Sequence, residues 1–192
     1  MTFFLSSFYL VTIPQYRRSG ILLAAVRPKE MRVPELMTIG YEGMTLGQFF
    51  RLLRHGEVET LVDVRELPLS RKPGFSKSAL SAAVASHGLS YAHAASLGCP
   101  RDIRHAFRAD GDWARYTQRF AEYMETQGGA IAQLAERVQA ERCCLLCFEA
   151  DPNFCHRSFV ADRVATTVGR SLTVTHLMAT SLRPVVPRLQ AA

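Results

Sequence analysis

The sequence contains no apolar run long enough to cross a membrane. A transmembrane helix needs about 20 consecutive apolar residues, and the longest candidate, residues 3–13, is much shorter. That segment has no basic start, and no small-residue cleavage site follows it, so it lacks the pattern of a secretory signal peptide. We therefore expect a cytoplasmic protein with no membrane partner.

Glycine-rich nucleotide motifs are also absent. The sequence has neither a phosphate-binding loop nor the glycine fingerprint of dinucleotide-binding folds. Internal repeats and low-complexity segments are missing as well. Nothing in the pattern demands a nucleotide, so the sequence identifies no cofactor, and it gives no indication of the oligomeric state.

Cysteine is scarce, with five residues. An odd number in a chain without an export signal favours reduced thiols over a disulfide framework. Cys144 and Cys147 have the spacing of a metal or redox pair, but in a strand two residues three apart point to opposite faces. We therefore predict no metal site, and we expect Cys143 and Cys144 to be small buried hydrophobes. The spacing does not indicate an iron–sulfur cluster either.

The net charge of +6 is unevenly distributed. Residues 1–36 carry +3 and residues 179–192 carry +2, whereas residues 37–178 hold 16 basic and 15 acidic groups. Within this central part, residues 64–119 contain nine basic and four acidic side chains. The positive stretch could attract an anionic ligand; the alternative is a set of solvated helix faces and loops.

The chain divides into a central domain and two tails. Residues 1–36 show no sustained periodicity and contain three prolines, so we expect an extension outside the fold. One hypothesis is a misassigned start at Met1, with Met31 or Met37 as the true first residue, which mass spectrometry of the native N-terminus would test. Residues 179–192 are expected to form a loose C-terminal tail.

Strand and helix patterns alternate along residues 37–178, which predicts one α/β domain. Helices are expected after the capping residues Thr45, Ser76 and Asp112, after the glycine pair at 128–129, and from about His156. Residues 97–111 are expected to be a long basic loop. The expected strands are residues 37–40, 60–65, 89–93, 143–148 and 172–177. Because helices separate most consecutive strands, we predict a three-layer α/β sandwich with a mostly parallel sheet of about five strands.

The turn between the fourth strand and its helix is rich in reactive side chains. In an open α/β sheet, ligands bind where strands end and helices begin. Cys155 would lie near free helix amides that favour a thiolate, or would simply be a buried thiol. His156 titrates near neutrality and suits a general acid or base, or it satisfies a buried carbonyl. The predicted catalytic candidates are Cys147, Glu149, Cys155 and His156.

Arg157 would stand in the first turn of that helix, where a cation is electrostatically unfavourable. We expect it to pair with the carboxylate of Glu149 or Asp151, or with a bound anion. If it pairs internally, the turn would be a self-satisfied polar cluster with only a structural role.

A second polar region follows the strand at 60–65. Asp63 lies in an apolar strand and needs a partner if it is buried, and Arg65 is expected to face the same crevice as Cys147. The helix start at Ser76 offers free amides for a phosphate. The predicted substrate-binding residues are Arg65, Arg157, Arg71 and Lys77.

Several motifs occur together in one order along the chain. They are residues 38–43, 61–65, 73–77 and 96–98, and Cys147-x-Glu149 followed by Cys155-His156-Arg157. With these motifs, residues 37–178 resemble the bacterial domain-of-unknown-function family 488. The resemblance implies an α/β domain in which Arg65, Cys147, Glu149, Cys155, His156 and Arg157 stand at the family's signature positions. It implies no established activity.

Residues 62–66 are also similar to the Asp-Val-Arg-Glu segment of rhodanese-type sulfurtransferases. In that family the catalytic cysteine heads a short loop that ends in an arginine five residues on. Here Asn153 stands six positions after Cys147, and Ala161 stands six positions after Cys155. Neither cysteine fits that loop. Because the likeness at residues 62–66 remains, thiol-dependent sulfur transfer is kept as an alternative function.

The function that these patterns favour is an enzyme. It would act on a small anionic substrate, phosphorylated or nucleotide-like, in a crevice lined by Arg65 and the turn at 147–157. An alternative is a nucleic-acid-associated, DNA-repair-like module, in which the positive stretch and its aromatic residues face phosphates and bases.

Overall fold

The computed structural model describes residues 33–169 and 172–181. Most of the expected N-terminal extension and C-terminal tail, including Met1 and Met31, lies outside the described residues. The first strand begins at Glu35, two residues before the expected start of the domain. Within the described ranges, no helix is both long and apolar enough to span a membrane.

Five parallel strands form one sheet in the order β3-β2-β4-β1-β5. The central strands β4 and β1 are buried almost throughout, as expected for parallel strands covered on both faces. The strands are β1 (Glu35–Gly40), β2 (Thr60–Asp63), β3 (Ser90–His93), β4 (Cys143–Cys147) and β5 (Thr173–Leu177). This sheet, with helices on both sides, confirms the predicted three-layer α/β sandwich.

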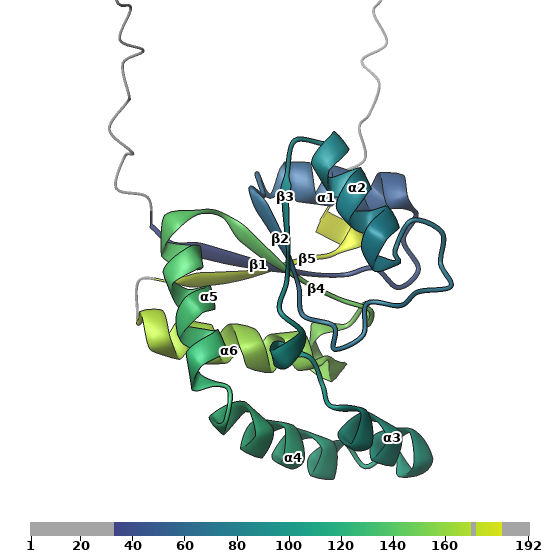
Figure 1. The fold of residues 1–192 in the computed structure, drawn as a ribbon, viewed down its shortest axis with the longest axis vertical. Helices are drawn as coiled ribbons and strands as arrows, with labels where there is room; N and C mark the ends of the chain where they lie inside the picture. Colours follow the sequence, from purple (N-terminus) through teal and green to yellow (C-terminus); the bar gives the residue numbers. More distant parts are fainter. Residues whose placement is uncertain (1–32, 170–171, 182–192) are drawn as a thin grey trace, which may run out of the picture. The chain divides into compact units, whose positions relative to one another are not determined.

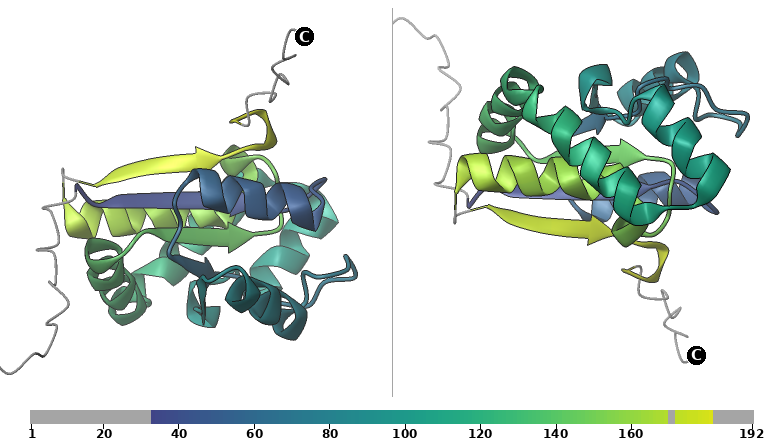
Figure 2. Two further views of the ribbon diagram at one scale, coloured as in Figure 1. Left: turned by 90° about the horizontal axis from the view of Figure 1, so that it is seen from above. Right: turned by 90° about the horizontal axis from the view of Figure 1, so that it is seen from below.

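Helices cover the two faces of the sheet (Figures 1 and 2). On one face lie α1 (Leu46–His55) and α2 (Lys77–Ser86), and on the other lie α5 (Gly128–Ala140) and α6 (His156–Val168). A helical pair, α3 (Arg101–Asp110) and α4 (Trp113–Glu125), packs next to α6 (Figure 1). Three short 3-10 helices complete the described part: η1 (Ala95–Leu97), η2 (Pro152–Phe154) and η3 (Ala179–Ser181).

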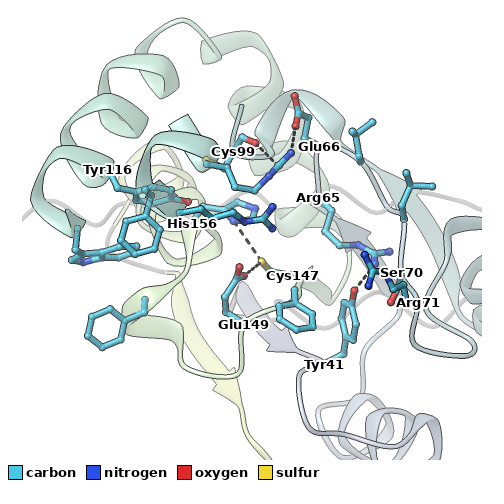
Figure 3. Close-up of a pocket in the computed structure, with 18 residues that line it drawn as sticks. Tyr41, Arg65, Glu66, Ser70, Arg71, Cys99, Tyr116, Cys147, Glu149 and His156 are labelled. Carbon is cyan, nitrogen blue, oxygen red and sulfur yellow. Dashed lines mark hydrogen bonds and ion pairs between the residues drawn. The ribbon is translucent and has the colours of Figure 1, made fainter. Parts of the chain in front are cut away.

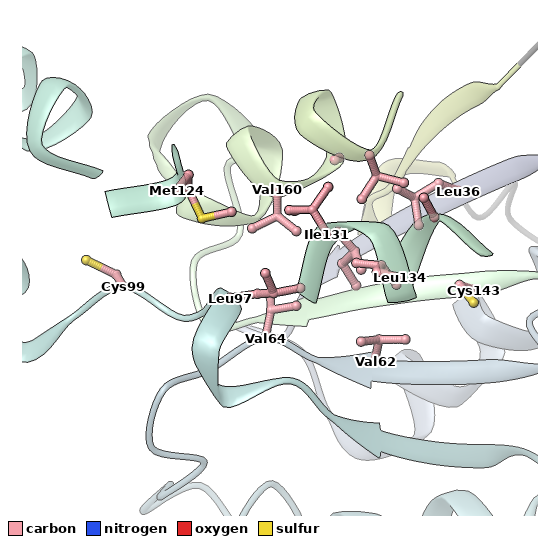
Figure 4. Packing of buried hydrophobic residues seen from close by; sticks show 14 of the residues in the cluster. Leu36, Val62, Val64, Leu97, Cys99, Met124, Ile131, Leu134, Cys143 and Val160 are labelled. Atoms are coloured by element: carbon pink, nitrogen blue, oxygen red, sulfur yellow. The ribbon is translucent and has the colours of Figure 1, made fainter. Parts of the chain in front are cut away.

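Each face of the sheet has its own apolar core, because neighbouring strand residues point in opposite directions. Cys143 and Leu145 of β4 contribute to the core under α4, α5 and α6 (Figure 4). Cys144 and Leu146 contribute to the core under α1 and α2. Cys143 and Cys144 are fully buried, which confirms the prediction that they are small core residues. Cys147 continues the face of Cys143 and Leu145, toward α6.

The capping residues act locally as expected at two of three helices. At α1, Thr45 and Gln48 form a complete capping box. At α4, the Asp112 side chain accepts a hydrogen bond from the Arg115 backbone N–H at 2.9 Å. Ser76 occupies the N-cap position of α2, but its side chain makes no capping hydrogen bond.

The predicted long loop at 97–111 is wrong, because most of it forms α3. The helix begins after Pro100, has Asp102 in its first turn, and ends at Gly111, which adopts φ +68. These are regular start and stop signals. Ile103 and Phe107, four residues apart, pack on the core, while the basic residues between them cover the other faces. The loop was predicted because charged residues dominate this segment and its apolar stripe is short.

The direction of the connections opens a crevice at the carboxyl ends of the strands. From β1 the chain passes through β2 to the edge strand β3, with α1 and α2 on one face. From β4 it passes beyond β1 to the other edge strand, β5, with α6 on the opposite face. Segments that leave adjacent strands toward opposite faces separate at the carboxyl ends, and ligand sites of open α/β sheets lie there.

Candidate functional site

A cavity of about 600 Å³ opens at the carboxyl ends of the central strands (Figure 3). Its floor comes from the segments that follow β1, β2 and β4, and one wall comes from α3 and α4. The lining residues are Tyr41, Arg65, Glu66, Leu67, Leu69, Ser70, Arg71, Cys99, Arg104, Phe107, Arg108, Trp113, Tyr116, Cys147, Phe148, Glu149, Phe154 and His156. The volume falls within the range of small-molecule sites.

The floor brings together the four predicted catalytic candidates. The thiol of Cys147 donates to Glu149 Oε2 at 2.6 Å and lies 3.5 Å from His156 Nδ1 (Figure 3). The thiol of Cys155 donates to the same carboxylate oxygen at 3.3 Å. One donor atom from each of the four residues lies within 4.8 Å of the others. Cys147, Glu149 and His156 line the cavity, whereas Cys155, only 1% exposed, lies behind them.

The orientation of His156 follows from its second nitrogen. Nε2 lies 3.0 Å from the carbonyl oxygen of Val64, which can only accept, so Nε2 carries a proton and donates to it. In the neutral ring, Nδ1 is then an unprotonated acceptor directed at Cys147. Sequence reasoning gave two roles for His156, and the geometry combines them: one nitrogen satisfies a buried carbonyl, and the other faces the reactive cluster.

Burial and mutual contact shift the protonation of the floor. Burial alone would raise the pKa of Glu149, but the hydrogen bond from Cys147 and the nearby His156 lower it below its ordinary value. Burial raises the pKa of Cys155 well above that of a free thiol, and Cys147 adds to the effect. Burial would lower the pKa of His156, whereas Cys155 and Glu149 raise it above its ordinary value. Glu149 is therefore a carboxylate at neutral pH.

Two roles were predicted for Cys155, a thiolate favoured by the helix amides and a buried thiol, and its surroundings favour the buried thiol. Cys155 is the N-cap residue of α6, as predicted, but its side chain makes no capping hydrogen bond. Burial disfavours the thiolate and the neighbouring Cys147 adds to the effect, so the pKa of Cys155 is raised instead of lowered. Cys155 is therefore a neutral thiol in this arrangement.

Arg157 donates to a hydroxyl and two backbone carbonyls and not to a carboxylate. Arg157 is 1% exposed, and its guanidinium donates to Thr38 Oγ1 at 3.2 Å, to the Ala150 carbonyl at 3.0 Å, and to the Glu149 carbonyl. The expected ion pair with Glu149 or Asp151 is therefore not formed, and Arg157 does not line the cavity. It clamps the backbone that carries Glu149, because those two carbonyls turn inward over the end of β1.

Arg65 lines the cavity, as predicted, but most of its donors are occupied. Nε donates to Asp63 Oδ1 at 2.8 Å and Nη2 to Oδ2 at 2.5 Å, while Nη1 donates to the Tyr41 hydroxyl and the Phe75 carbonyl. Burial alone would lower the pKa of Arg65, but the Asp63 ion pair raises it above its ordinary value. This pair also explains the rhodanese-like segment, because Asp63 and Arg65 brace the end of β2.

The other two predicted binding residues differ from each other. Arg71 lines the cavity, is exposed, and forms no hydrogen bond or ion pair with any other described residue. Lys77 lies outside the cavity and contacts His93 Nδ1 at 3.0 Å. Arg71 thus remains a candidate for anion binding, and Lys77 does not belong to this site.

Sequence reasoning missed the wall made by α3 and α4. Arg104 is committed to Glu66 at 2.9 Å and to the Cys99 carbonyl, but Arg108 is exposed and, among the described residues, unpaired. The ring of Trp113 stacks on Tyr116, with centroids 4.8 Å apart. These residues stood within the positive stretch at 64–119, but their aromatic spacing also fits a helix facing the core.

Exposed apolar side chains gather at the cavity. Six large hydrophobic side chains are exposed in the described residues, and four of them line this cavity: Leu67, Leu69, Phe148 and Phe154. Single exposed apolar residues are common on protein surfaces, but a contiguous group beside polar residues marks a binding site. The mouth is therefore both apolar and, at Arg71 and Arg108, positively charged.

Comparison with known proteins agrees with the motifs. The family described as "Domain of unknown function DUF488" matches residues 45–164, which is more than half of the chain. No curated protein and no solved structure gives a significant match. The matched range runs from the start of α1 into α6 and includes every lining residue of the cavity except Tyr41. The chain therefore belongs to the DUF488 family.

Proposed function

We propose that the protein is an enzyme that binds a phosphorylated, nucleotide-like substrate in this cavity and reacts with it at the floor. The observation that carries the proposal is the combination of three kinds of side chain around one cavity. A buried polar cluster lies at the bottom, aromatic rings form the wall, and two arginines that pair with no other described residue stand at the mouth. Convergence of polar groups in an apolar pocket is typical of active sites.

Substrate binding is assigned to the wall and the mouth. Arg71 and Arg108 can place guanidinium groups on a phosphate, since neither is paired with another described residue. Trp113 on the wall, and Phe148 and Phe154 at the mouth, present rings against which a planar base can stack. A ligand with an aromatic ring at one end and a phosphate at the other fits this distribution of charge.

The reaction is assigned to Glu149, with His156 and Cys147 beside it. Glu149 reaches the cavity and already accepts two hydrogen bonds, so it is placed to take a proton from a substrate or from water. Cys155 cannot reach a ligand in the cavity without movement of the floor, because it is buried and does not line the cavity. Cys155, although a predicted catalytic candidate, is therefore given no direct contact with the substrate.

Calorimetric binding to the full chain tests the proposal. The probes are the four ribonucleoside monophosphates, the matching nucleosides and ribose 5-phosphate. We expect a monophosphate to bind more tightly than either of its parts. Arg71→Ala with Arg108→Ala should weaken binding of the monophosphate and leave the nucleoside unaffected. Arg51→Ala, an exposed arginine of α1 away from the cavity, is the matched control.

Failure of every nucleotide to bind, or equal weakening by the Arg51 control, would refute the proposal. A second candidate, a nucleic-acid-associated module, is favoured by the exposed apolar group at the mouth. It predicts that a short single-stranded oligonucleotide binds more tightly than any monophosphate, with affinity that falls steeply as salt rises. A flat salt dependence would exclude it.

A further inference from the structure

We propose that the floor of the cavity is a zinc site, in which Cys147, Cys155 and His156 are the ligands and Glu149 stands beside the ion as a general base. The inference deepens the proposed function, because it assigns a metal to the same reacting centre. It starts from the donor set: two thiols and one imidazole are ligands that Zn²⁺ prefers, and zinc enzymes use Cys₂His with an open fourth position.

The spacing of the donor atoms fits a tetrahedral ion. With Zn–S near 2.3 Å and Zn–N near 2.05 Å, a sulfur and a nitrogen ligand are roughly 3.5 Å apart. Cys147 Sγ and His156 Nδ1 are 3.5 Å apart, and Cys155 Sγ lies within 4.8 Å of both. The three donors therefore need only small side-chain rotations to share one ion.

The surroundings of His156 are those of a metal ligand. A zinc-bound histidine almost always donates its other ring N–H to a carbonyl or carboxylate, which fixes the ring and the tautomer. His156 does this through Nε2 to Val64 O at 3.0 Å, and Nδ1 faces the two thiols. Arg157 holds the Glu149 and Ala150 carbonyls between the cysteines, so the loop that spaces the ligands is also restrained.

A metal also accounts for two thiols clustered on one carboxylate. As thiols, Cys147 and Cys155 both donate to Glu149 Oε2. Binding of Zn²⁺ would release both protons and turn the cysteines into thiolate ligands. Positive charge at the ion would then offset the carboxylate. Cys155, which cannot reach a ligand in the cavity, acquires a role as the ligand on the buried side.

The fourth position would face the cavity, where Glu149 lies. A water bound there would give a proton to the Glu149 carboxylate, and its oxygen would form a bond to an electrophilic carbon of the substrate. As the bond from that carbon to the leaving group breaks, the leaving group would take the proton from Glu149. The balance is the hydrolysis of one bond by one water, with the metal lowering the pKa of the water.

The first test measures metal without substrate. The full chain, purified under reducing conditions, is analysed by plasma mass spectrometry and then stripped and titrated with Zn²⁺. X-ray absorption of the zinc-loaded protein counts the ligands. We expect about one ion per chain, with two sulfur ligands near 2.3 Å and the remaining ligands nitrogen or oxygen. No tight binding, or a first shell without sulfur, would overturn the proposal.

Substitutions locate the site. Cys147→Ser and Cys155→Ser should each weaken zinc binding by at least about 100-fold, beyond the effect of losing an outer-shell partner. Cys99→Ser is the matched control, because Cys99 is as deeply buried and lines the same cavity but lies outside the cluster. Equal loss in the control would overturn the assignment. The Glu149→Gln variant should still bind zinc. If this variant lost the zinc, Glu149 would be a ligand, and its proposed role as a general base would be refuted.

The two proposals fail separately. Zinc bound by the three residues in a protein that binds no nucleotide would leave the metal site standing and refute the proposed substrate class. Nucleotide binding by the metal-free protein, with no zinc affinity, would keep the substrate class and refute the metal site.

Discussion

Gly40, the last residue of β1, is the position where one methyl group should do most damage to the floor. A Cβ atom there would lie 1.7 Å from the Glu149 carbonyl oxygen, 2.6 Å from its carbonyl carbon and 2.9 Å from Arg157 Nη1. The first two are backbone atoms and cannot rotate away. Gly40→Ala must therefore push the loop that carries Glu149 off the end of β1.

The magnitude follows from the required movement. An ordinary carbon–oxygen contact is longer than 3 Å, so the backbones must separate by roughly 1.5 Å. This would break the hydrogen bond from Arg157 to the Glu149 carbonyl, worth about 1.5–3 kcal/mol, and add overpacking strain of about 1–3 kcal/mol. We expect a loss of about 3–5 kcal/mol in the free energy of unfolding, and ~100-fold in any activity that depends on the Glu149 carboxylate.

Urea unfolding of Gly40→Ala and wild type, followed by circular dichroism, measures the first effect. The control is Gly129→Ala in α5, where a Cβ meets nothing within 4 Å and the helix should gain up to about 1 kcal/mol. A Gly40→Ala protein as stable as the wild type would refute the close approach of β1 and the Glu149 loop.

Substitutions of Arg157, Asp63 and Trp113, two of them with a control variant, test individual contacts. Arg157→Met should cost about 3–5 kcal/mol in urea unfolding, because it leaves two inward carbonyls without a donor; a loss below ~1 kcal/mol would contradict the clamp. Asp63→Asn should cost a similar amount, since Arg65 would be buried without its counter-ion. The control is Asp102→Asn, which breaks the exposed ion pair with Arg119 and should cost less than ~1 kcal/mol in the free energy of unfolding. Equal losses in Asp63→Asn and Asp102→Asn would count against the argument from burial. Trp113→Ala should lower nucleotide affinity by about 1–3 kcal/mol in calorimetry, while Trp113→Phe keeps most of it; unchanged affinity in both would remove the ring from the site.

Local patterns predicted the fold well, because they depend on near neighbours. The capping box at Thr45 and the alternation of β4 needed only sequence spacing, and both are confirmed. The same alternation predicts that Cys144 and Cys147 face opposite sides of the sheet, as they do in the structure. The helix α3 was missed because its apolar stripe is short and the charges around it dominate the composition.

The site was harder to predict, because its energetics depend on distant segments. For Cys155, the field of the helix start was visible in the sequence, but the burial that opposes it was not. For Arg157, the true partners are backbone carbonyls that turn inward over Gly40, and no side-chain pattern signals them. The zinc proposal likewise joins Cys147 to residues eight and nine positions away, through a turn whose shape the sequence does not reveal.

Fluorescence of Trp113 tests the central claim most directly. It is the single tryptophan of the chain and lines the proposed substrate cavity, so the signal comes from the site alone. The account predicts a saturable change in its emission when a nucleoside monophosphate is added, weakened in the Arg71→Ala and Arg108→Ala double variant, and a smaller change with ribose 5-phosphate. Emission that does not change with any nucleotide, or that changes equally in the double variant, would contradict it.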